Sequence, residues 1–397
     1  MNGLLGNYSK LLRNLIIFWV LAAFLLILPE FSLAETQVLP VVKIGALLDL
    51  SGPLSNEGTA AYKSLQYAVE EINLQGGVGG RSLEVIVFDT ASDETRLLSG
   101  AYQLLDEGAI VLVGPTSPGN CLTLRRFAEN KHIPLVLIAG TSPVLTFSGI
   151  KTRWTFSVTE NFASELKALF SIFRRRGYRS IGVVVQAGNF YKELFLWIRG
   201  YAPEYGLRVT CAEGFNLNSE DISRKISYMN RCDPDVALLW ADSQAKSLIF
   251  PELSRADTPV AISHTLLDFG AFQGANDMYG LFLVAIPAPL APVGLQKGLS
   301  FGARNFLARW GSELAAMKFD AKLAAAQAWD AAHIIALALK KGGIRGRSYL
   351  RSVLEGRIKS YWGVMGRFSF DKRDHSGLDP KSLLLLRYFR GRWSWLK

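Results

Sequence analysis

Apolar and polar positions follow a regular order between residues 41 and 90. A nearly continuous apolar run at 41–48 predicts a strand that is buried on both faces. Apolar residues then recur at steps of three and four, which predicts a helix over about 59–73. Glycines between 76 and 80 end that helix, and a second apolar run at 83–88 predicts another buried strand. The stretch is therefore one strand–helix–strand unit.

The same alternation continues along the rest of the chain. Further strands are expected at 109–113, 135–139, 181–185, 207–211, 236–240, 260–263 and 280–286. Helical periodicity separates most of them, and helices are also expected at 298–310, 322–341 and 347–355. Strands that alternate with helices predict parallel, doubly wound α/β sheets, and the length favours two lobes. In such sheets ligands bind beyond the carboxyl ends of the strands, so the loops at 51–58, 114–119 and 139–143 should meet at one crevice.

The first 34 residues have the pattern of a secretion signal. Lys10 and Arg13 precede an apolar run at 15–28, and small residues at Ser32 and Ala34 predict cleavage after Ala34. An uncleaved anchor is the alternative, but a membrane span normally needs about 20 apolar residues. We therefore expect a periplasmic protein.

The formal net charge of +10 raises the question of a nucleic-acid partner. Secretion argues against one, and the basic residues are scattered along the chain. The densest run, 174–176, lies at the end of a predicted helix, where cations complement the helix dipole. Basic and aromatic residues at 387–393 fit a terminal hairpin that turns at Gly391. We expect no nucleic-acid partner.

Residues typical of catalysis or metal binding are poorly arranged. The four histidines have no metal-ligand spacing, and 114–119 misses the nucleophile-elbow spacing by one residue. We therefore predict no enzyme activity, no metal and no cofactor. Three cysteines in an exported chain allow one disulfide, for which Cys211 and Cys232 are the expected pair, while Cys121 is expected to be a buried free thiol.

The crevice loops combine hydroxyl side chains with backbone N–H groups at expected helix starts, which is the composition of an anion site. Ser117, Thr141 and Ser142 are the hydroxyl residues concerned. Ser142 precedes a proline, as a helix N-cap residue often does. The alternative is that all three residues only cap helices.

Several motifs occur in the order and spacing of one known family. In the first unit they are Ser51-Gly52, Gly58, Ile72-Asn73, the glycine-rich turn 76–81 and Asp89. Later ones are Gly114-Pro115, Thr141-Ser142-Pro143, Pro234-Asp235-Val236, Trp329-Asp330-Ala331 and the run 366–371. Together they resemble extracytoplasmic solute-binding proteins of the leucine/isoleucine/valine-binding type, which have the type I periplasmic binding fold.

The resemblance implies how the mature chain is divided. Lobe one would comprise 35–156 and return at 287–363. Lobe two would comprise 157–286 and end with closing strands within 364–397, at 368–370 and 383–388. Three crossings near 156, 287 and 363 would form a three-stranded hinge.

The resemblance also implies a binding site for an amino acid. The amino acid would be held by Ser117, by N–H groups of the loop 116–119, by the Ala139 carbonyl and by Thr141, and the hydroxyl and N–H groups among these would donate to its carboxylate. Lobe two would close over it through Phe190 or Tyr191. Its ammonium group would meet an acid, for which Asp268 and Asp242 are the candidates.

Glu57 departs from the family pattern, because branched-chain binders have an apolar or aromatic contact at the matching position. A carboxylate that faces the crevice would favour a ligand with an amide, amine or other cationic end. A side chain that points to solvent is the alternative.

The resemblance thus implies a monomeric receptor that captures a small polar solute and delivers it to an ABC permease. The alternatives are a ligand-sensing co-receptor of a signalling system, or a binder of an amide or amine rather than an amino acid.

Overall fold

The computed structural model describes residues 13, 15–19, 39–139, 152–160, 162–187, 189–241, 245–253, 255–267, 282–296 and 298–396. The chain divides into two compact units, Met1–Pro40 and Val41–Lys397. In the smaller unit, residues 15–19 are helical and their side chains are exposed. None of the helices in the described ranges combines the length and apolar character that a membrane crossing requires.

The larger unit begins with a five-stranded parallel sheet, here called the first sheet, in the order β2-β1-β3-β4-β5. Its strands are β1 (Val42–Leu48), β2 (Leu83–Asp89), β3 (Val111–Val113), β4 (Leu135–Leu137) and β5 (Thr155–Ser157). The first four lie in the apolar runs that predicted them. Because β1 is central and covered on both faces, its sequence is apolar almost throughout.

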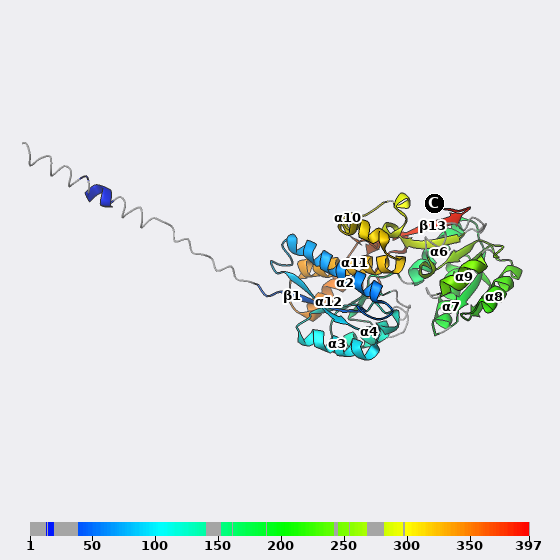
Figure 1. Ribbon diagram of the computed structural model, residues 1–397, viewed down its shortest axis with the longest axis horizontal. Coiled ribbons are helices and arrows are strands. Elements are labelled where there is room, and N and C mark those ends of the chain that lie inside the picture. Colours follow the sequence, from blue (N-terminus) through cyan, green and yellow to red (C-terminus); the bar gives the residue numbers. More distant parts are fainter. Residues whose placement is uncertain are drawn as a thin grey trace, which may run out of the picture. The chain divides into compact units, whose positions relative to one another are not determined.

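Helices cover both faces of the first sheet (Figure 1). Ile44, Ala46 and Leu48 pack with α2 (Ser55–Leu74) and α11 (Phe319–Gly342). Leu47 points to the opposite face and packs with α3 (Glu94–Asp106) and α4 (Cys121–Lys131). Next to α11 lie α10 (Phe301–Ala316) and α12 (Arg347–Arg357). The alternation of side chains along β1 therefore divides the core into two layers.

The second sheet has seven strands in the order β14-β13-β10-β9-β8-β6-β7. They are β6 (Ser180–Gln186), β7 (Arg208–Phe215), β8 (Val236–Trp240), β9 (Val260–Ile262), β10 (Phe282–Pro287), β13 (Leu383–Phe389) and β14 (Arg392–Trp395). The first five run parallel, and β13 and β14 are antiparallel additions. The helices of this part are α6 (Phe162–Arg175), α7 (Asn189–Tyr201), α8 (Ser219–Arg231) and α9 (Lys246–Leu253).

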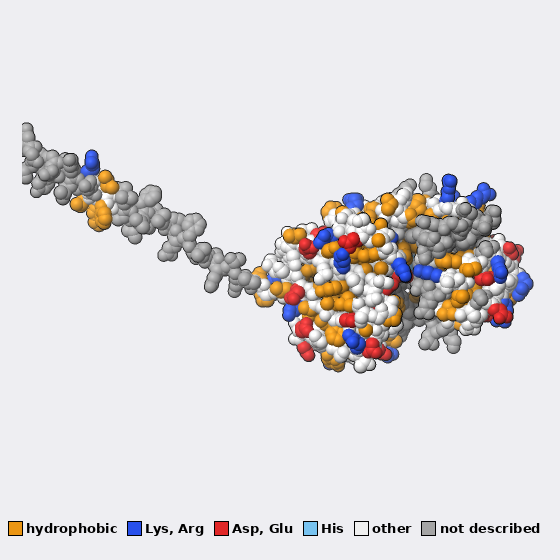
Figure 2. Space-filling view, viewed as in Figure 1, with side chains coloured by type: hydrophobic (Ala, Val, Ile, Leu, Met, Phe, Trp, Pro, Cys, Tyr) orange, Lys and Arg blue, Asp and Glu red, His pale blue; other side chains and the backbone are white. Residues whose placement is uncertain are grey.

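The C-terminal hairpin is confirmed. Phe389 pairs with Arg392 across the turn at Gly391, so the basic and aromatic residues there belong to a sheet edge. On the face shown in Figure 2, basic and acidic side chains are interspersed.

The expectation that the strand at 368–370 closes the second sheet together with 383–388 is wrong. β12 (Arg367–Phe368) pairs instead with β11 (Tyr361–Trp362) in a separate two-stranded sheet. The rings of Phe370 and Phe156 pack edge to face at 5.4 Å, and the His375 carbonyl accepts a hydrogen bond from the Ser157 N–H. The chain therefore stays beside β5 as far as His375, beyond the crossing expected near 363. The lobe limits given above stay a prediction.

The cysteines are all free thiols. Cys121 is buried, as expected, and burial raises the pKa of its thiol. Cys211 and Cys232 are not joined, so the expected disulfide is not formed in this structure. They are neighbours nevertheless, because burial and a hydrogen bond with Cys232 raise the pKa of Cys211 to about 12. Their pairing under oxidising conditions stays a prediction.

A buried ionic cluster, His264 with Glu160 and Glu165, lies where the chain passes from β5 to the second sheet. His264, in η4 (His264–Leu266) after β9, places Nδ1 2.9 Å from Glu165 Oε2 and Nε2 3.1 Å from Glu160 Oε1. Gln327 of α11 donates from Nε2 to Glu160 Oε2 at 3.3 Å. The cluster therefore joins the second sheet to a helix of the first.

The two carboxylates keep His264 charged. Burial alone would lower the pKa of His264, but the charges of Glu165, Glu160 and Asp320 and the hydrogen bond with Glu165 outweigh it and raise the pKa to about 9. A buried charge without such partners would be strongly destabilising.

Gly58 permits a close approach that no other residue allows. A Cβ atom there would lie 2.0 Å from the carbonyl oxygen of Asp49. We expect Gly58→Ala to lower the free energy of unfolding by about 1–3 kcal/mol or more, because the backbone must move. Gly200→Ala is the control, since a Cβ there meets nothing within 4 Å, and it should be neutral or slightly stabilising. Equal losses in urea unfolding would contradict this account.

The ionic cluster predicts a pH dependence of stability. A histidine whose pKa rises from 6.5 unfolded to about 9 folded contributes stability that is complete below pH 6.5 and is lost as the pH rises through 9. Urea unfolding between about pH 6 and about pH 8, below the range in which the buried thiols would ionise in the unfolded chain, should show the first part of this loss in the wild type, and His264→Gln should reduce it.

The control for this experiment is His132→Asn, at an exposed position with a φ of 51° that asparagine tolerates. It should keep the wild-type pH dependence. An NMR titration that placed the pKa of His264 at or below 6.5 would refute the account.

Candidate functional site

A buried aspartate connects the loops at the carboxyl ends of three strands. Asp49 follows β1, and its Oδ2 accepts a hydrogen bond from Thr116 Oγ1 at 2.9 Å in the loop after β3. Its Oδ1 accepts hydrogen bonds from Thr90 Oγ1 and Ser92 N, both in the loop after β2. Thr116 Oγ1 also accepts the Asp49 N–H at 2.9 Å. These bonds fix the loops after β1, β2 and β3 relative to one another. Of the third predicted crevice loop, 139–143, only Ala139 lies within the described residues.

A second aspartate holds the turn that leads into α2. Asp89, at the end of β2, accepts hydrogen bonds from Leu50 N and Ser51 N, at 2.9 and 3.1 Å. Ser51 Oγ donates to the same carboxylate at 2.6 Å. Desolvation alone would raise the pKa of Asp89, but these hydrogen bonds and one from the Ala91 N–H together outweigh it and lower the pKa. The Ser-Gly turn and the acid at the strand end, both noted in the sequence, therefore contact each other.

The loop after β3 contains two candidate ligand contacts. Ser117 is half-buried at the start of η1 (Pro118–Asn120), but its side chain makes no capping hydrogen bond. Asn120 is only 8% exposed, and among the described residues its Nδ2 has no hydrogen-bond partner. A buried donor left unpaired costs about 1–3 kcal/mol, so this amide is suited to receive an acceptor. Ala139, two residues beyond β4, is also buried.

Glu57 lies in the first turn of α2 and is half-buried. Its Oε2 is buried and, within the described ranges, has no hydrogen-bond partner. Burial is the main cause that raises the pKa of Glu57, and the charges of Asp320 and Asp49 add to it, against a backbone hydrogen bond and Lys318. Asp320 also lies 3.5 Å from Lys246 of α9. Glu57 is therefore close to a point where a helix of the first sheet meets one from the second.

Other predicted site residues are not tested. Thr141, Ser142, Asp242 and Asp268 lie outside the described residues. Phe190 and Tyr191 lie in α7, but their side chains are outside the description. Their roles stay predictions.

Trp240 is a core residue. It ends β8, is 2% exposed, and packs edge to face on Phe162 with the ring centroids 5.2 Å apart. It is therefore part of the core beneath the carboxyl end of the second sheet.

Sequence reasoning missed Asp49, Thr116 and Asn120. The available signal for Asp49 and Thr116 was their position, since each is a polar residue just beyond the end of a buried strand, whereas Asn120 lies farther on, at the end of η1. No group of three or more potential metal ligands occurs among the residues that the structure describes.

Comparisons with known proteins agree with this geometry. A family model described as periplasmic binding protein matches residues 41–384. Among curated proteins, the leucine-, isoleucine-, valine-, threonine-, and alanine-binding protein of Pseudomonas aeruginosa is 22% identical over 190 residues, which cover 48% of this chain and 51% of that protein. The chain thus spans about half the length of the curated relatives it matches.

Solved structures share the fold over a longer span. An ABC transporter substrate-binding protein from Desulfitobacterium hafniense in complex with Leu has a TM-score of 0.72 at 19% identity, covering 90% of this chain and 100% of that one. The branched-chain amino acid transporter substrate-binding protein LivJ from Streptococcus pneumoniae, in complex with isoleucine, has a TM-score of 0.65 at 20% identity, covering 89% and 98%. These likenesses show a two-lobed α/β fold. Because the family model spans most of the sequence, this chain belongs to the periplasmic binding protein family.

Proposed function

We propose that this protein is a periplasmic receptor that captures a small polar solute, an amino acid or a related compound, and delivers it to an ABC permease. It acts as a monomer, without a catalytic step or a cofactor. The solute lies beyond the carboxyl ends of the strands, where this class of sheet binds ligands. Family membership over 41–384 supports the class of function, and relatives with bound leucine or isoleucine support the class of solute.

The observation that carries the proposal is the buried amide of Asn120. It lies after the loop that Thr116 fixes to Asp49, and the Asn120 N–H donates to the carbonyl of the half-buried Ser117 at 3.2 Å. A carboxylate is the acceptor best suited to such a donor, because hydrogen bonds to a charged oxygen are about twice as strong as neutral ones. Asn120 and Ser117 would hold the carboxylate together with Thr141, while Ala139 offers its carbonyl to the ammonium group.

A second candidate ligand follows from Glu57. Its buried, unpartnered Oε2 and the nearby charge of Asp320 favour a positively charged group. We propose that the solute has an amine or amide at the end opposite its carboxylate. A purely aliphatic side chain would leave the Glu57 oxygen unsatisfied, at a cost of about 1–3 kcal/mol.

Thermal unfolding of residues 35–397 with a panel of amino acids tests the receptor function. A ligand at a hundred times its Kd should stabilise the protein by about 2.7 kcal/mol and raise the Tm. Thr141→Ala and Asn120→Asp should both reduce that shift, the first by removing a donor and the second by placing a carboxylate against the ligand. Thr123→Ala, whose hydroxyl contacts only Glu94 in the described chain, is the control and should keep it. A shift that both site variants retain in full would exclude this carboxylate site.

A comparison of lysine, glutamine and leucine tests the role of Glu57. Calorimetry on the wild type should give the tightest binding for the amine or amide side chain, and Glu57→Gln should weaken lysine binding about tenfold while sparing leucine. Glu70→Gln is the matched control, since Glu70 lies on the same helix in an exposed pair with Arg309. If leucine binds more tightly than lysine to both the wild type and Glu57→Gln, the ligand is aliphatic and the proposed role of Glu57 is wrong.

A further inference from the structure

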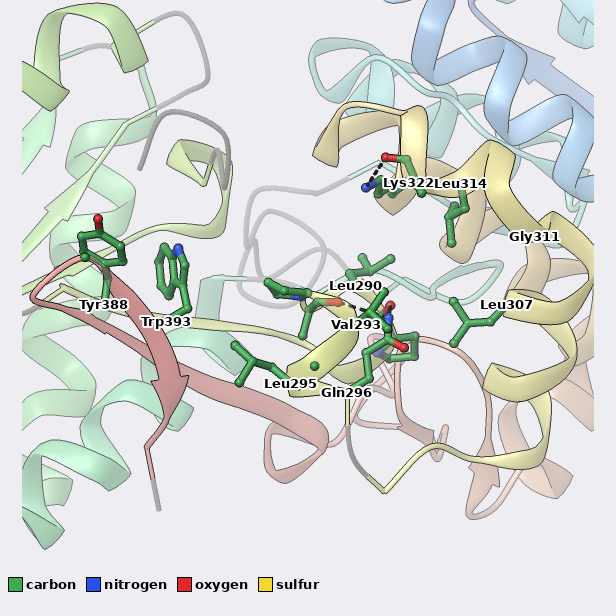
Figure 3. A pocket seen from close by; sticks show the side chains of 16 residues that line it. Leu290, Val293, Leu295, Gln296, Leu307, Gly311, Leu314, Lys322, Tyr388 and Trp393 are labelled. Carbon is green, nitrogen blue, oxygen red and sulfur yellow. Dashed lines mark hydrogen bonds between the residues drawn. The ribbon is translucent and has the colours of Figure 1, made fainter. Parts of the chain in front are cut away.

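A second pocket lies apart from the strand-end crevice. It has a volume of about 740 Å³ and is formed by the segment after β10, by α10 and the start of α11, and by the C-terminal hairpin (Figure 3). None of Glu57, Ser117 and Ala139 lines it. Small-molecule pockets usually have volumes of about 300–1,000 Å³, so this one can hold a compact organic ligand.

The pocket wall is mostly apolar. In Figure 3, Leu307 and Leu314 of α10 lie on one side and Tyr388 and Trp393 of the hairpin lie on the other. Leu290, Val293 and Leu295 lie between them. Val293 of this wall is 84% exposed. A pocket lined mainly by apolar side chains favours an apolar ligand body.

The segment that forms the floor is held in place internally. Gln296 Nε2 donates to the carbonyl of Pro289 at 2.8 Å and to that of Ala291 at 3.1 Å. The two short helices η5 (Ala288–Leu290) and η6 (Val293–Leu295) are thereby fixed to each other. The wall is consequently preformed, which reduces the entropy cost of binding.

One charged side chain lines the pocket, that of Lys322. Its Nζ donates to the Ala315 carbonyl at 3.3 Å, and among the described residues it has no carboxylate within ion-pair distance. Of the sixteen residues that line the pocket, none is acidic. Gly391 also lines the pocket, and its two neighbours in the chain, Arg390 and Arg392, are exposed basic residues. Burial lowers the pKa of Lys322, because an ammonium group loses hydration there. A bound anion would compensate for that loss and favour the charged form.

We propose that this pocket is a second ligand site for a small amphipathic carboxylate. The apolar body lies against the leucines and Trp393, and the carboxylate pairs with Lys322. The proposal does not depend on the solute site between the strand ends, because the two share no residue.

Calorimetry on residues 35–397 tests the proposal with octanoate and indole-3-acetate as probes. Octanamide and indole-3-acetamide, which have the same apolar bodies without the charge, are the matched comparisons. The carboxylates should bind at least about tenfold more tightly than the amides, because only they pair with the ammonium group.

Two variants locate the binding. Lys322→Met should weaken carboxylate binding about tenfold and remove the preference over the amides. Val293→Asp, at an exposed position that should not affect folding, should also weaken carboxylate binding by placing a like charge in the wall. Lys340→Met is the control, since Lys340 is an exposed residue of the same helix and its loss changes the net charge equally.

Three outcomes would overturn the proposal: no carboxylate binding, equal binding of acids and amides, or a Lys322→Met variant that binds like the wild type. Asn120→Asp separates the two sites. It should leave octanoate affinity unchanged, and a large loss there would place the fatty acid in the crevice. Octanoate binding by the wild type, with no amino-acid binding by the same protein, would refute the proposed function and keep this site.

Discussion

The carboxylate of Asp49 is the contact on which the candidate site depends. A buried carboxylate must be paired or hydrogen-bonded, because desolvation without compensation costs several kcal/mol. Asp49 meets this requirement by accepting hydrogen bonds from the loops after β2 and β3 while lying after β1 itself. The same bonds that satisfy the charge therefore fix the loop that carries Ser117 and Asn120. Gly58 completes the arrangement, since only a residue without Cβ lets α2 approach the Asp49 carbonyl.

A second set of charges connects the parts of the fold that belong to different sheets. Asp320 of α11 affects the pKa of both Glu57 and His264 and lies 3.5 Å from Lys246 of α9. Gln327 of the same helix binds Glu160. The start of α11 thus contacts charged groups from both sheets. A ligand that brought a positive charge to Glu57 would change the electrostatic potential at the start of α11. Solute binding would thereby affect the contacts between the parts of the fold that contain the first and the second sheet.

Most of the fold could be predicted from the sequence because burial of parallel strands is a local pattern. The apolar runs at 41–48 and 236–240 correspond to β1 and β8, and the helical period of 59–73 falls inside α2. The strand at 368–370 was placed in the wrong sheet, because a short apolar run does not reveal its partner and Phe156 provides the contact surface. The place of Ser117 followed from the rule that loops after parallel strands converge. The unpaired amide of Asn120 could not be predicted, since a missing partner is defined only by the residues that surround it in space.

The most direct test of the central claim is the side-chain amide resonance of Asn120 in a ¹⁵N–¹H NMR titration of residues 35–397, assigned by its absence in Asn120→Ser. The solute that raises the Tm most should shift this resonance downfield and saturate it at the same concentration as the thermal effect, because the amide gains a charged acceptor. If the solute binds and the Asn120 resonance stays in place, the carboxylate is not held in the loop after β3 and the account of the site is wrong.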